Sequence, residues 1–506
     1  MKNIFLISLS LLVMFICSVN QVDGQVGDMG HSKEFYLNPV LGGDYPDPSV
    51  LRVGNDFYMT HSSFNYYPGL LIWHSTDLIH WERVCHALNK NVGSVWAPDL
   101  IKYKETYYIY FPAGGTNWVV TAKSPEGPWT EPVDLKLTGL IDPGHVVTPD
   151  GKRYLYLSDG NLIQLTEDGL SAIGEPKHIY EGWQFPKTWS TECFCLEAPK
   201  STVKDGYYYL TVAEGGTAGP ATSHMVVSAR AKSPSGPYEN SPYNPVVHTG
   251  DRSERWWSQG HGTLVDDIDG HYWIMYHGYE QNFHTLGRQT LMLPVEWTAD
   301  KWFVVPASVK SSNKIPVPAG IKSGNGTGLS DDFSGNILGL QWQFYKRFLP
   351  ERIKLSDGKL FFKAEGTSFD NSSPLLVNSC DNAYEIQVEY TIEDGVTAGL
   401  CLYYNELANV RIAADTGQFA IHIQKNDKIS EKNLIGKHGY LRILNDNNEV
   451  SFYFSGDGKS WSRVDRSLDA TGYNHNDFGE FLSLRAGLFA FGKGKVIFDN
   501  FIYRKQ

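Results

Sequence analysis

The stretch "LEAPKSTVKDGYYYL", Leu196 to Leu210, joins an acidic residue to a hairpin signal and decides the fold. Its Asp-Gly pair is a two-residue turn signal, and the aromatic run after it favours a β-strand. Related segments are "NDFYMTHS" from Asn55, "KETYYIYF" from Lys104, "DGKRYLYL" from Asp150 and "DGHYWIMY" from Asp269. Their spacing of about 45 to 65 residues is typical of four-stranded propeller blades. The sequence therefore predicts an all-β chain that begins with a five-bladed β-propeller over residues 35–306.

Each repeat carries a side chain of chemical interest at one position, eight residues before the turn. In chain order these residues are Asp47, Trp96, Asp142, Glu197 and His261. The inner strands of a propeller converge on a central channel, so equivalent strand ends form a ring. Three carboxylates gathered in one cavity are costly unless they have a use. We therefore expect this ring to be a catalytic cavity.

Acidic residues near turns have a simpler interpretation, because aspartates often cap turns by accepting backbone hydrogen bonds. The segment "WAPD" shows how the two interpretations are separated. Its Asp99 lies three residues beyond Trp96 and so points to the opposite face of a strand. We expect Asp99 to be structural.

Aromatic residues cluster in the sequence around the predicted ring. Most tryptophans of a propeller pack between blades, but those near loops are well placed to line a ligand site. Trp73, Trp96 and Trp257 are the predicted binding residues of this kind. Apolar ring faces with polar rims suit sugars, and paired carboxylates cleave glycosidic bonds.

The segment from "NPVLGGDYPDPS" to "LGRQTLMLPVEW" resembles glycoside hydrolase family 43, whose fold is a five-bladed propeller. The family has a base in a "DPS" segment, an acid in an "EAP" segment and a second aspartate that adjusts the pKa of the acid. By this resemblance the base is Asp47, the acid is Glu197 and the modulator is Asp142. The resemblance also implies that His261 in "GHGTLV" lies near the channel and that Arg288 in "LGRQTLMLP" binds the terminal sugar.

The resemblance implies an exo-acting β-xylosidase or α-L-arabinofuranosidase that inverts the anomeric centre of plant cell-wall glycans. An endo-arabinanase, an exo-galactanase and a non-catalytic sugar-binding propeller are the alternatives, and the complete trio argues against the last. Pro143 after the aspartate and the "CFCLEAPK" context depart from the family pattern and leave the substrate open. No cofactor is expected for catalysis, because no strand is followed by a phosphate-cradling glycine loop.

The C-terminal part has a different character. Residues 307–329 are rich in Ser, Gly, Pro and Lys and are predicted to be a linker. Short alternating strands over residues 330–506 predict a β-sandwich, which resembles the lectin-like, concanavalin A-like domain of many xylosidases in the family. Asp332 and Asp499 would then lie near each other around a structural calcium ion; turn capping or salt bridging is the alternative.

Residues 1–24 are predicted to be a signal peptide, and a secreted or periplasmic protein is expected. The apolar run is shorter than the ~20 residues of a membrane span. Phe15 and Ile16 are too bulky for Cys17 to be a lipid-attachment site. The formal net charge of -12 argues against a nucleic-acid partner and leaves a neutral oligosaccharide or polysaccharide as the expected one.

The remaining cysteines are few and odd in number, which does not indicate a disulfide framework. Cys193 and Cys195 are close in sequence and are not expected to pair with each other. We expect all of these cysteines to be thiols.

Overall fold

The computed structural model describes residues 34–322, 324–415, 418–423, 427–431 and 436–506. The predicted signal peptide, residues 1–24, lies outside these residues. Within the described ranges, no helix has the length and apolar character needed to cross a membrane.

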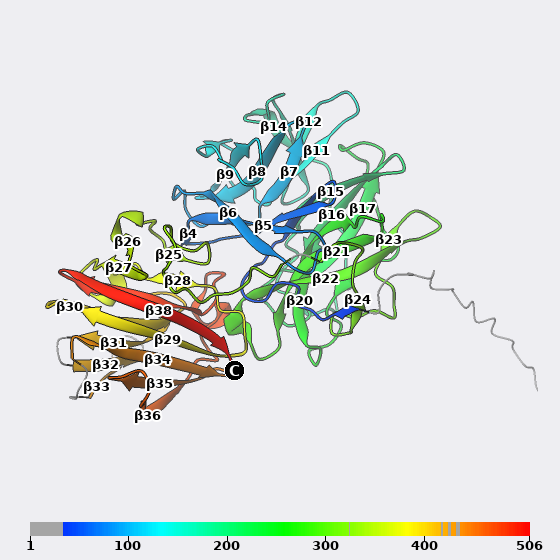
Figure 1. Cartoon of the computed structure of the whole chain (residues 1–506). Coiled ribbons are helices and arrows are strands. Elements are labelled where there is room, and N and C mark those ends of the chain that lie inside the picture. The colour runs from blue at the N-terminus through cyan, green and yellow to red at the C-terminus, as the bar shows by residue number, and fades with distance from the viewer. Residues whose placement is uncertain (1–33, 323, 416–417, 424–426, 432–435) are drawn as a thin grey trace, which may run out of the picture. The chain divides into compact units, whose positions relative to one another are not determined.

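Five antiparallel sheets follow one another along the first part of the chain (Figure 1). The first contains β2 (Ser49–Val53), β3 (Asp56–Thr60), β5 (Gly69–Ser75) and β6 (Glu82–Leu88). The second contains β7 (Asp99–Tyr103), β8 (Thr106–Ala113), β9 (Thr116–Ala122) and β10 (Val133–Asp134). The third contains β11 (Gly144–Val147), β12 (Arg153–Leu157), β13 (Asn161–Leu165) and β14 (Ala172–His178).

The fourth contains β15 (Glu197–Lys204), β16 (Tyr207–Glu214), β17 (Met225–Ala231) and β18 (Glu239–Asn240), with β19 (Val247–His248) also on β17. The fifth contains β20 (Trp256–Asp266), β21 (Tyr272–Glu280), β22 (Arg288–Trp297) and β23 (Phe303–Val304). The predicted repeats thus correspond to one sheet each, and the predicted all-β class is confirmed.

The hairpin predicted around Asp205-Gly206 forms between β15 and β16. Lys204 pairs with Tyr207, so Asp205 and Gly206 form a two-residue turn. Both turn residues have positive φ, 51° and 75°, as a type I′ turn requires. This turn matches the right-handed twist of the strands, which is why Asp-Gly marks the position.

Two larger sheets make up the C-terminal part, and side chains of both share one hydrophobic core. One sheet has the order β33 (Asp427–Glu431), β32 (Gln418–Ile423), β31 (Asn409–Asp415), β30 (Val396–Tyr403), β37 (Arg485–Gly492), β28 (Leu375–Val377), β25 (Gln343–Tyr345) and β4 (Tyr66–Tyr67). The other has the order β26 (Ile353–Ser356), β27 (Lys359–Lys363), β38 (Lys495–Lys505), β29 (Ala383–Ile392), β34 (His438–Asp446), β35 (Glu449–Ser455) and β36 (Ser462–Asp469). The predicted β-sandwich is therefore present.

Short elements complete the described part of the chain. A two-stranded pair joins β1 (Phe35–Tyr36) to β24 (Ile315–Pro316), which lies in the predicted linker. The helical elements are α1 (His475–Phe478) and the 3-10 turns η1 (His284–Leu286), η2 (Pro350–Arg352) and η3 (Phe369–Asn371). The exact limits proposed for the domains stay predictions.

One strand connects the two parts. Strand β4 lies between β3 and β5 in the chain, yet it pairs with β25 of the sandwich, Phe344 opposite Tyr67. Two residues of the propeller segment, those of β4, are therefore hydrogen-bonded at the edge of a sandwich sheet.

The expectation for the cysteines is wrong in one respect, because Cys193 and Cys195 form a disulfide. The chain turns sharply between them, and Cys195 has a φ of 43°. Their Cα atoms stand 5.3 Å apart, within the range that a disulfide spans. Cys85 and Cys380 are half-buried thiols, and Cys401 is a buried one.

Candidate active site

The five ring residues predicted by counting line one cavity of about 110 Å³. Glu197 and His261 lie in the first strands of the fourth and fifth sheets, while Asp47, Trp96 and Asp142 lie two or three residues before the first strands of the first, second and third. Arg288, at the start of β22, lines the same cavity. The structure therefore brings together all three predicted catalytic acids and three of the five predicted binding residues.

The backbone at three ring positions has the same unusual conformation. Asp47, Asp142 and His261 have φ values of 58°, 57° and 59°. Side chains other than glycine rarely adopt this left-handed region, and such strain is concentrated at functional sites. The coincidence supports the structural equivalence of the repeats independently of their sequences.

Asp47 is a buried carboxylate held by several polar groups. The Nη1 atom of Arg288 lies 3.3 Å from its Oδ1, and the Nδ1 atoms of His261 and His277 lie 3.2 and 3.0 Å from the same oxygen. The Ser62 hydroxyl donates to its Oδ2. These contacts favour the ionised form of the carboxyl.

Burial of Asp47 is the largest single effect and opposes ionisation, but the charge of Arg288 together with the contacts of His261 and His277 outweighs it and holds the pKa of Asp47 well below its ordinary value. Burial also lowers the pKa of His261 to about 3 and that of His277 to about 4. Both imidazoles are therefore neutral near pH 7 and act on Asp47 as hydrogen-bonding groups. Arg288 supplies the positive charge that keeps Asp47 ionised.

Glu197 has the opposite electrostatic character. Burial, and then the negative charges of Asp142 and Asp47, raise its pKa well above the ordinary value. Burial and the charge of Asp47 also raise the pKa of Asp142, to about 7. The Ala198 N–H donates to Asp142 Oδ2 at 3.1 Å, which ties Asp142 to the backbone beside Glu197. The cavity thus holds one ionised carboxylate and one carboxyl that keeps its proton.

Asp99 lies outside the lining of this cavity and makes structural contacts. It accepts from Lys200 Nζ at 2.8 Å and from the His145 backbone N–H at 2.7 Å. Asp99 and Lys200 are both buried, so their ion pair links the second and fourth sheets. These contacts agree with the structural role expected for Asp99.

Asp99→Asn is expected to lower the free energy of unfolding by roughly 3–5 kcal/mol, because it leaves the buried Lys200 ammonium without a counter-charge. The turnover of the folded fraction should change little. Urea denaturation and active-site-normalised kinetics measure the two effects separately. A large loss of turnover at unchanged stability would place Asp99 in the chemistry.

Two predicted binding residues lie elsewhere, and this part of the prediction needs correction. Trp73 is fully buried within β5, where its ring contacts Tyr45 and the Arg83 guanidinium. Trp257 donates its indole N–H to the Glu254 carbonyl oxygen at 2.9 Å. Neither residue lines the cavity around Asp47.

Sequence reasoning missed an aromatic side chain that comes from the sandwich. Phe481 lines the cavity, and its ring centroid lies 6.5 Å from that of Phe64 and 6.4 Å from that of Trp96. The Arg288 guanidinium lies 5.0 Å from the same ring. The ring of His475 stacks on Phe481 at 4.1 Å and fixes its position.

Other lining residues were also not predicted. Glu192 and Thr217 line the cavity, as does Cys195 of the disulfide. Glu192 lies just before the disulfide, and its Oε2 accepts from the Ala218 N–H at 2.8 Å. Glu192 and Cys195 are close in sequence to "LEAP", but this proximity does not show the direction of a loop side chain, and Thr217 has no such signal.

The predicted calcium ligands have other partners. Asp332 is exposed and accepts the Ser334 N–H at 2.9 Å, as a turn-capping aspartate does. Asp499 pairs with Lys359 Nζ at 3.3 Å. Neither belongs to a group of three potential ligand side chains among the residues that the structure describes.

Asp47, His261 and His277 form the one group of three potential ligands found in the described part of the chain, with their atoms within 4.8 Å. Calcium prefers six to eight oxygen ligands, whereas this group offers two nitrogens and one carboxylate. The Arg288 charge on the same carboxylate also opposes a cation. The group does not fit a calcium ion, so we assign no step to a metal.

Comparison with known proteins identifies relatives of both parts of the chain. The model for glycosyl hydrolases family 43 matches residues 36–303. The model for the beta xylosidase C-terminal concanavalin A-like domain matches residues 330–504. The sandwich is thus of the expected concanavalin A-like type.

Named relatives cover most of the chain. A xylan 1,3-beta-xylosidase of a Vibrio species is 29% identical over 86% of this chain and 91% of its own. A non-reducing end alpha-L-arabinofuranosidase of Bacteroides ovatus is 30% identical over 70% of each. The crystal structure of a family 43 protein of Bacillus licheniformis has a TM-score of 0.86 at 29% identity and covers 94% of this chain and 100% of its own.

Proposed function

Because the chain belongs to glycosyl hydrolases family 43 and is a glycoside hydrolase, we propose that it removes terminal xylose or arabinofuranose from plant cell-wall glycans by single displacement. The proposal rests mainly on two carboxyls, Asp47 and Glu197, that line one cavity and have pKa values shifted in opposite directions. The pKa of Asp47 is lowered and that of Glu197 is raised. Two carboxyls with these protonation states are what an inverting hydrolase needs.

In the proposed reaction Asp47 accepts a proton from a water molecule as the water oxygen attacks the anomeric carbon. Glu197 donates its proton to the glycosidic oxygen, so that the bond to the leaving group breaks without releasing an alkoxide. The product has the opposite anomeric configuration, and one proton has moved from Glu197 to the leaving group. Asp142 keeps the acid protonated through its negative charge.

The dimensions of the cavity support exo action. At about 110 Å³ it is smaller than the roughly 300–1,000 Å³ usual for drug-sized ligands, so one small sugar ring fits better than a chain. Phe481, Phe64 and Trp96 close part of its wall. The names of the relatives, a xylosidase and an arabinofuranosidase, agree with a terminal pentose. An endo-arabinanase would need an open cleft.

Product stereochemistry tests the proposal. Proton NMR of the first-formed sugar, recorded before mutarotation, should show inversion on an aryl xyloside or an aryl arabinofuranoside. Linear arabinan should be a poor substrate for internal cleavage. A product that retains the configuration of the substrate would overturn the role of Asp47 as base.

We also propose that the protein is exported, on the basis of its N-terminal sequence.

Asp142→Asn is expected to move the alkaline limb of the kcat/KM profile to lower pH. The acid must be protonated to act, so activity falls as pH rises through the pKa of Glu197. Removing the charge of Asp142 lowers that pKa, because the negative charge of Asp142 is, after burial, the main cause that raises it. The exposed Asp150→Asn serves as control and should leave the profile unchanged. An unshifted limb in Asp142→Asn would contradict the assigned role.

Phe481→Ala is expected to raise KM roughly tenfold, which corresponds to about 1.4 kcal/mol, while kcat changes less. The substitution removes the sandwich's part of the cavity wall but touches neither Asp47 nor Glu197 in the described contacts. Phe491→Ala, a half-buried site on β37 of the same domain, controls for loss of domain stability. Equal KM values for the two variants would exclude Phe481 from substrate binding.

A further inference from the structure

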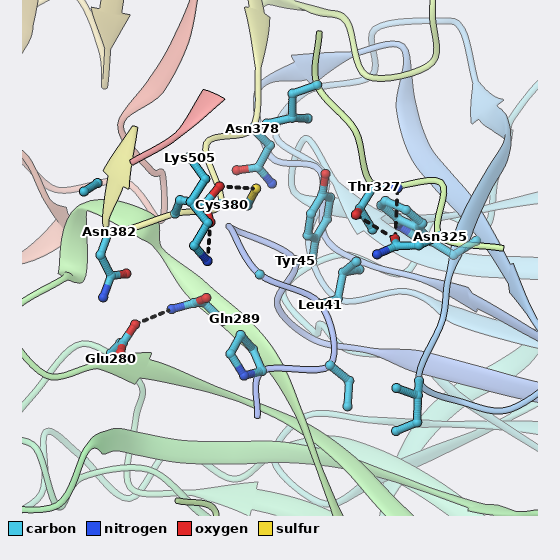
Figure 2. A pocket seen from close by; sticks show the side chains of 18 of the residues that line it. Leu41, Tyr45, Glu280, Gln289, Asn325, Thr327, Asn378, Cys380, Asn382 and Lys505 are labelled. Carbon is cyan, nitrogen blue, oxygen red and sulfur yellow. Dashed lines mark hydrogen bonds and ion pairs between the residues drawn. The ribbon is translucent and has the colours of Figure 1, made fainter. Parts of the chain in front are cut away.

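A second cavity, of about 560 Å³, lies between residues of the propeller, the connecting segment and the sandwich (Figure 2). Tyr45 and Gln289 line it from the propeller, Asn325 from the connecting segment, and Asn382 from the sandwich. None of the three catalytic acids lines it. Its volume is within the range of small-molecule sites, which the cavity around Asp47 does not reach.

Four of the charged residues of the second cavity form two ion pairs. Glu280 pairs with Arg255 at 2.8 Å, and Asp381 pairs with Lys505 at 2.9 Å. Arg83 donates to the carbonyl oxygens of the connecting segment, at 2.6 Å in the case of Gly326. Because the four charges are paired and the Arg83 donors point at backbone carbonyls, the wall suits a neutral ligand better than an ion.

Two polar groups of the wall lack a protein partner. The Tyr45 hydroxyl and the Asn382 amide make no hydrogen bond to any residue that the structure describes. This set offers donors and an amide acceptor to a ligand that carries both kinds of group.

The arrangement of these groups suits a polyhydroxylated ring. Figure 2 shows Asn382, Gln289 and Tyr45 around one open space, with the ring of Tyr45 forming part of the wall. Sugars present an apolar ring face and hydroxyls that both donate and accept. A neutral wall, an aromatic ring and side-chain amides therefore match a neutral sugar better than a charged metabolite.

We propose that this second cavity is a non-catalytic binding site for a neutral oligosaccharide of the glycan that the enzyme degrades. The proposal rests on the proposed function for the identity of the glycan. The Asn382 amide and the Tyr45 hydroxyl bind the sugar hydroxyls, and the Tyr45 ring packs on a sugar face. The site holds a chain at the enzyme without taking part in cleavage.

Calorimetric titration of Glu197→Gln, which binds sugar without cleaving it, tests the proposal with xylotriose and arabinotriose as probes. We expect two equivalents of one probe to bind. Asn382→Trp, which fills the second cavity, should remove one equivalent and leave the other. Asn336→Trp, at an exposed asparagine of the sandwich outside the cavity, should keep both. If Asn382→Trp fails to fold, Asn382→Ala should weaken the second equivalent about tenfold.

Binding of a single equivalent, or a second equivalent that is unaffected by both Asn382 variants, would overturn the proposal. Loss of the second equivalent in Asn336→Trp as well would also overturn it. These results leave the proposed function intact. That function fails separately, if the unmodified enzyme hydrolyses neither aryl xylosides nor aryl arabinofuranosides.

Discussion

Asp47→Asn is expected to reduce kcat/KM by about 10²–10⁴-fold or more, the contribution of a well-placed general base. The amide has nearly the shape of the carboxylate but cannot accept the proton of the attacking water. The effect is expected on all substrates, whatever their leaving group, because water activation is needed in each case. Steady-state kinetics on aryl glycosides measures it. Asp150→Asn, an exposed substitution of the same chemistry, should retain full activity.

Asp47→Ala with sodium azide separates a base from a purely structural carboxylate. The shortened side chain leaves room for an anion beside Arg288, whose Nη1 lies 3.3 Å from Asp47 Oδ1 in the unmodified protein. Azide attacks without a base, so the rate should partly recover and yield a glycosyl azide of inverted configuration. No recovery with an intact fold would indicate that Asp47 acts only by holding Arg288 in place.

The three predicted catalytic acids could be placed in one cavity from the sequence because their positions follow from local pairing. Each acid stands at a fixed distance from a hairpin turn, and turn residues such as Asp205-Gly206 are specified by backbone conformation. The count of eight residues back from the turn therefore reaches the equivalent position in every blade. The same counting kept Asp99 out of the predicted ring, and in the structure Asp99 begins β7 and pairs with Lys200.

The remaining parts of the site depend on contacts between distant segments. Phe481 reaches the cavity from the sandwich, and no periodicity links it to Phe64. His277 contacts Asp47 because β21 lies beside β20, and its position was not reached by counting. Trp73 was predicted to bind the ligand, but it lies on β5, the third strand of its sheet, and is fully buried there.

The disulfide between Cys193 and Cys195 was not predicted from the sequence, for a related reason. Separation along the chain does not determine separation in space where the backbone turns through a positive φ. The loop that carries this disulfide also carries Glu192 and leads to Glu197. Such loops set the shape of the pocket. The sequence therefore predicts hydrolysis of a glycosidic bond more readily than it predicts which sugar is bound.

Glu197→Gln is expected to show a loss of activity that depends on the leaving group. For a glycan or an alkyl glycoside the departing alkoxide needs the proton, so the loss should reach about 10²–10⁴-fold. For a 2,4-dinitrophenyl glycoside the leaving group departs as a stable anion, so the loss should be small. Asp47 remains ionised in this variant and still activates water, because Arg288 lowers its pKa.

The measurement is kcat/KM for a series of aryl glycosides of increasing phenol pKa, in the unmodified enzyme and in Glu197→Gln. A plot of log kcat/KM against the pKa of the phenol should have a shallow slope for the unmodified enzyme and a steep slope for Glu197→Gln. Only in the variant does negative charge develop on the departing oxygen without a proton to neutralise it. Glu131→Gln, at an exposed site, should follow the unmodified enzyme. An equal loss for every leaving group would show that Glu197 orients the sugar or stabilises charge, and the donated proton would then have to come from another carboxyl. Asp142 is the nearest candidate by protonation state, because its pKa is raised to about 7 in the same cavity.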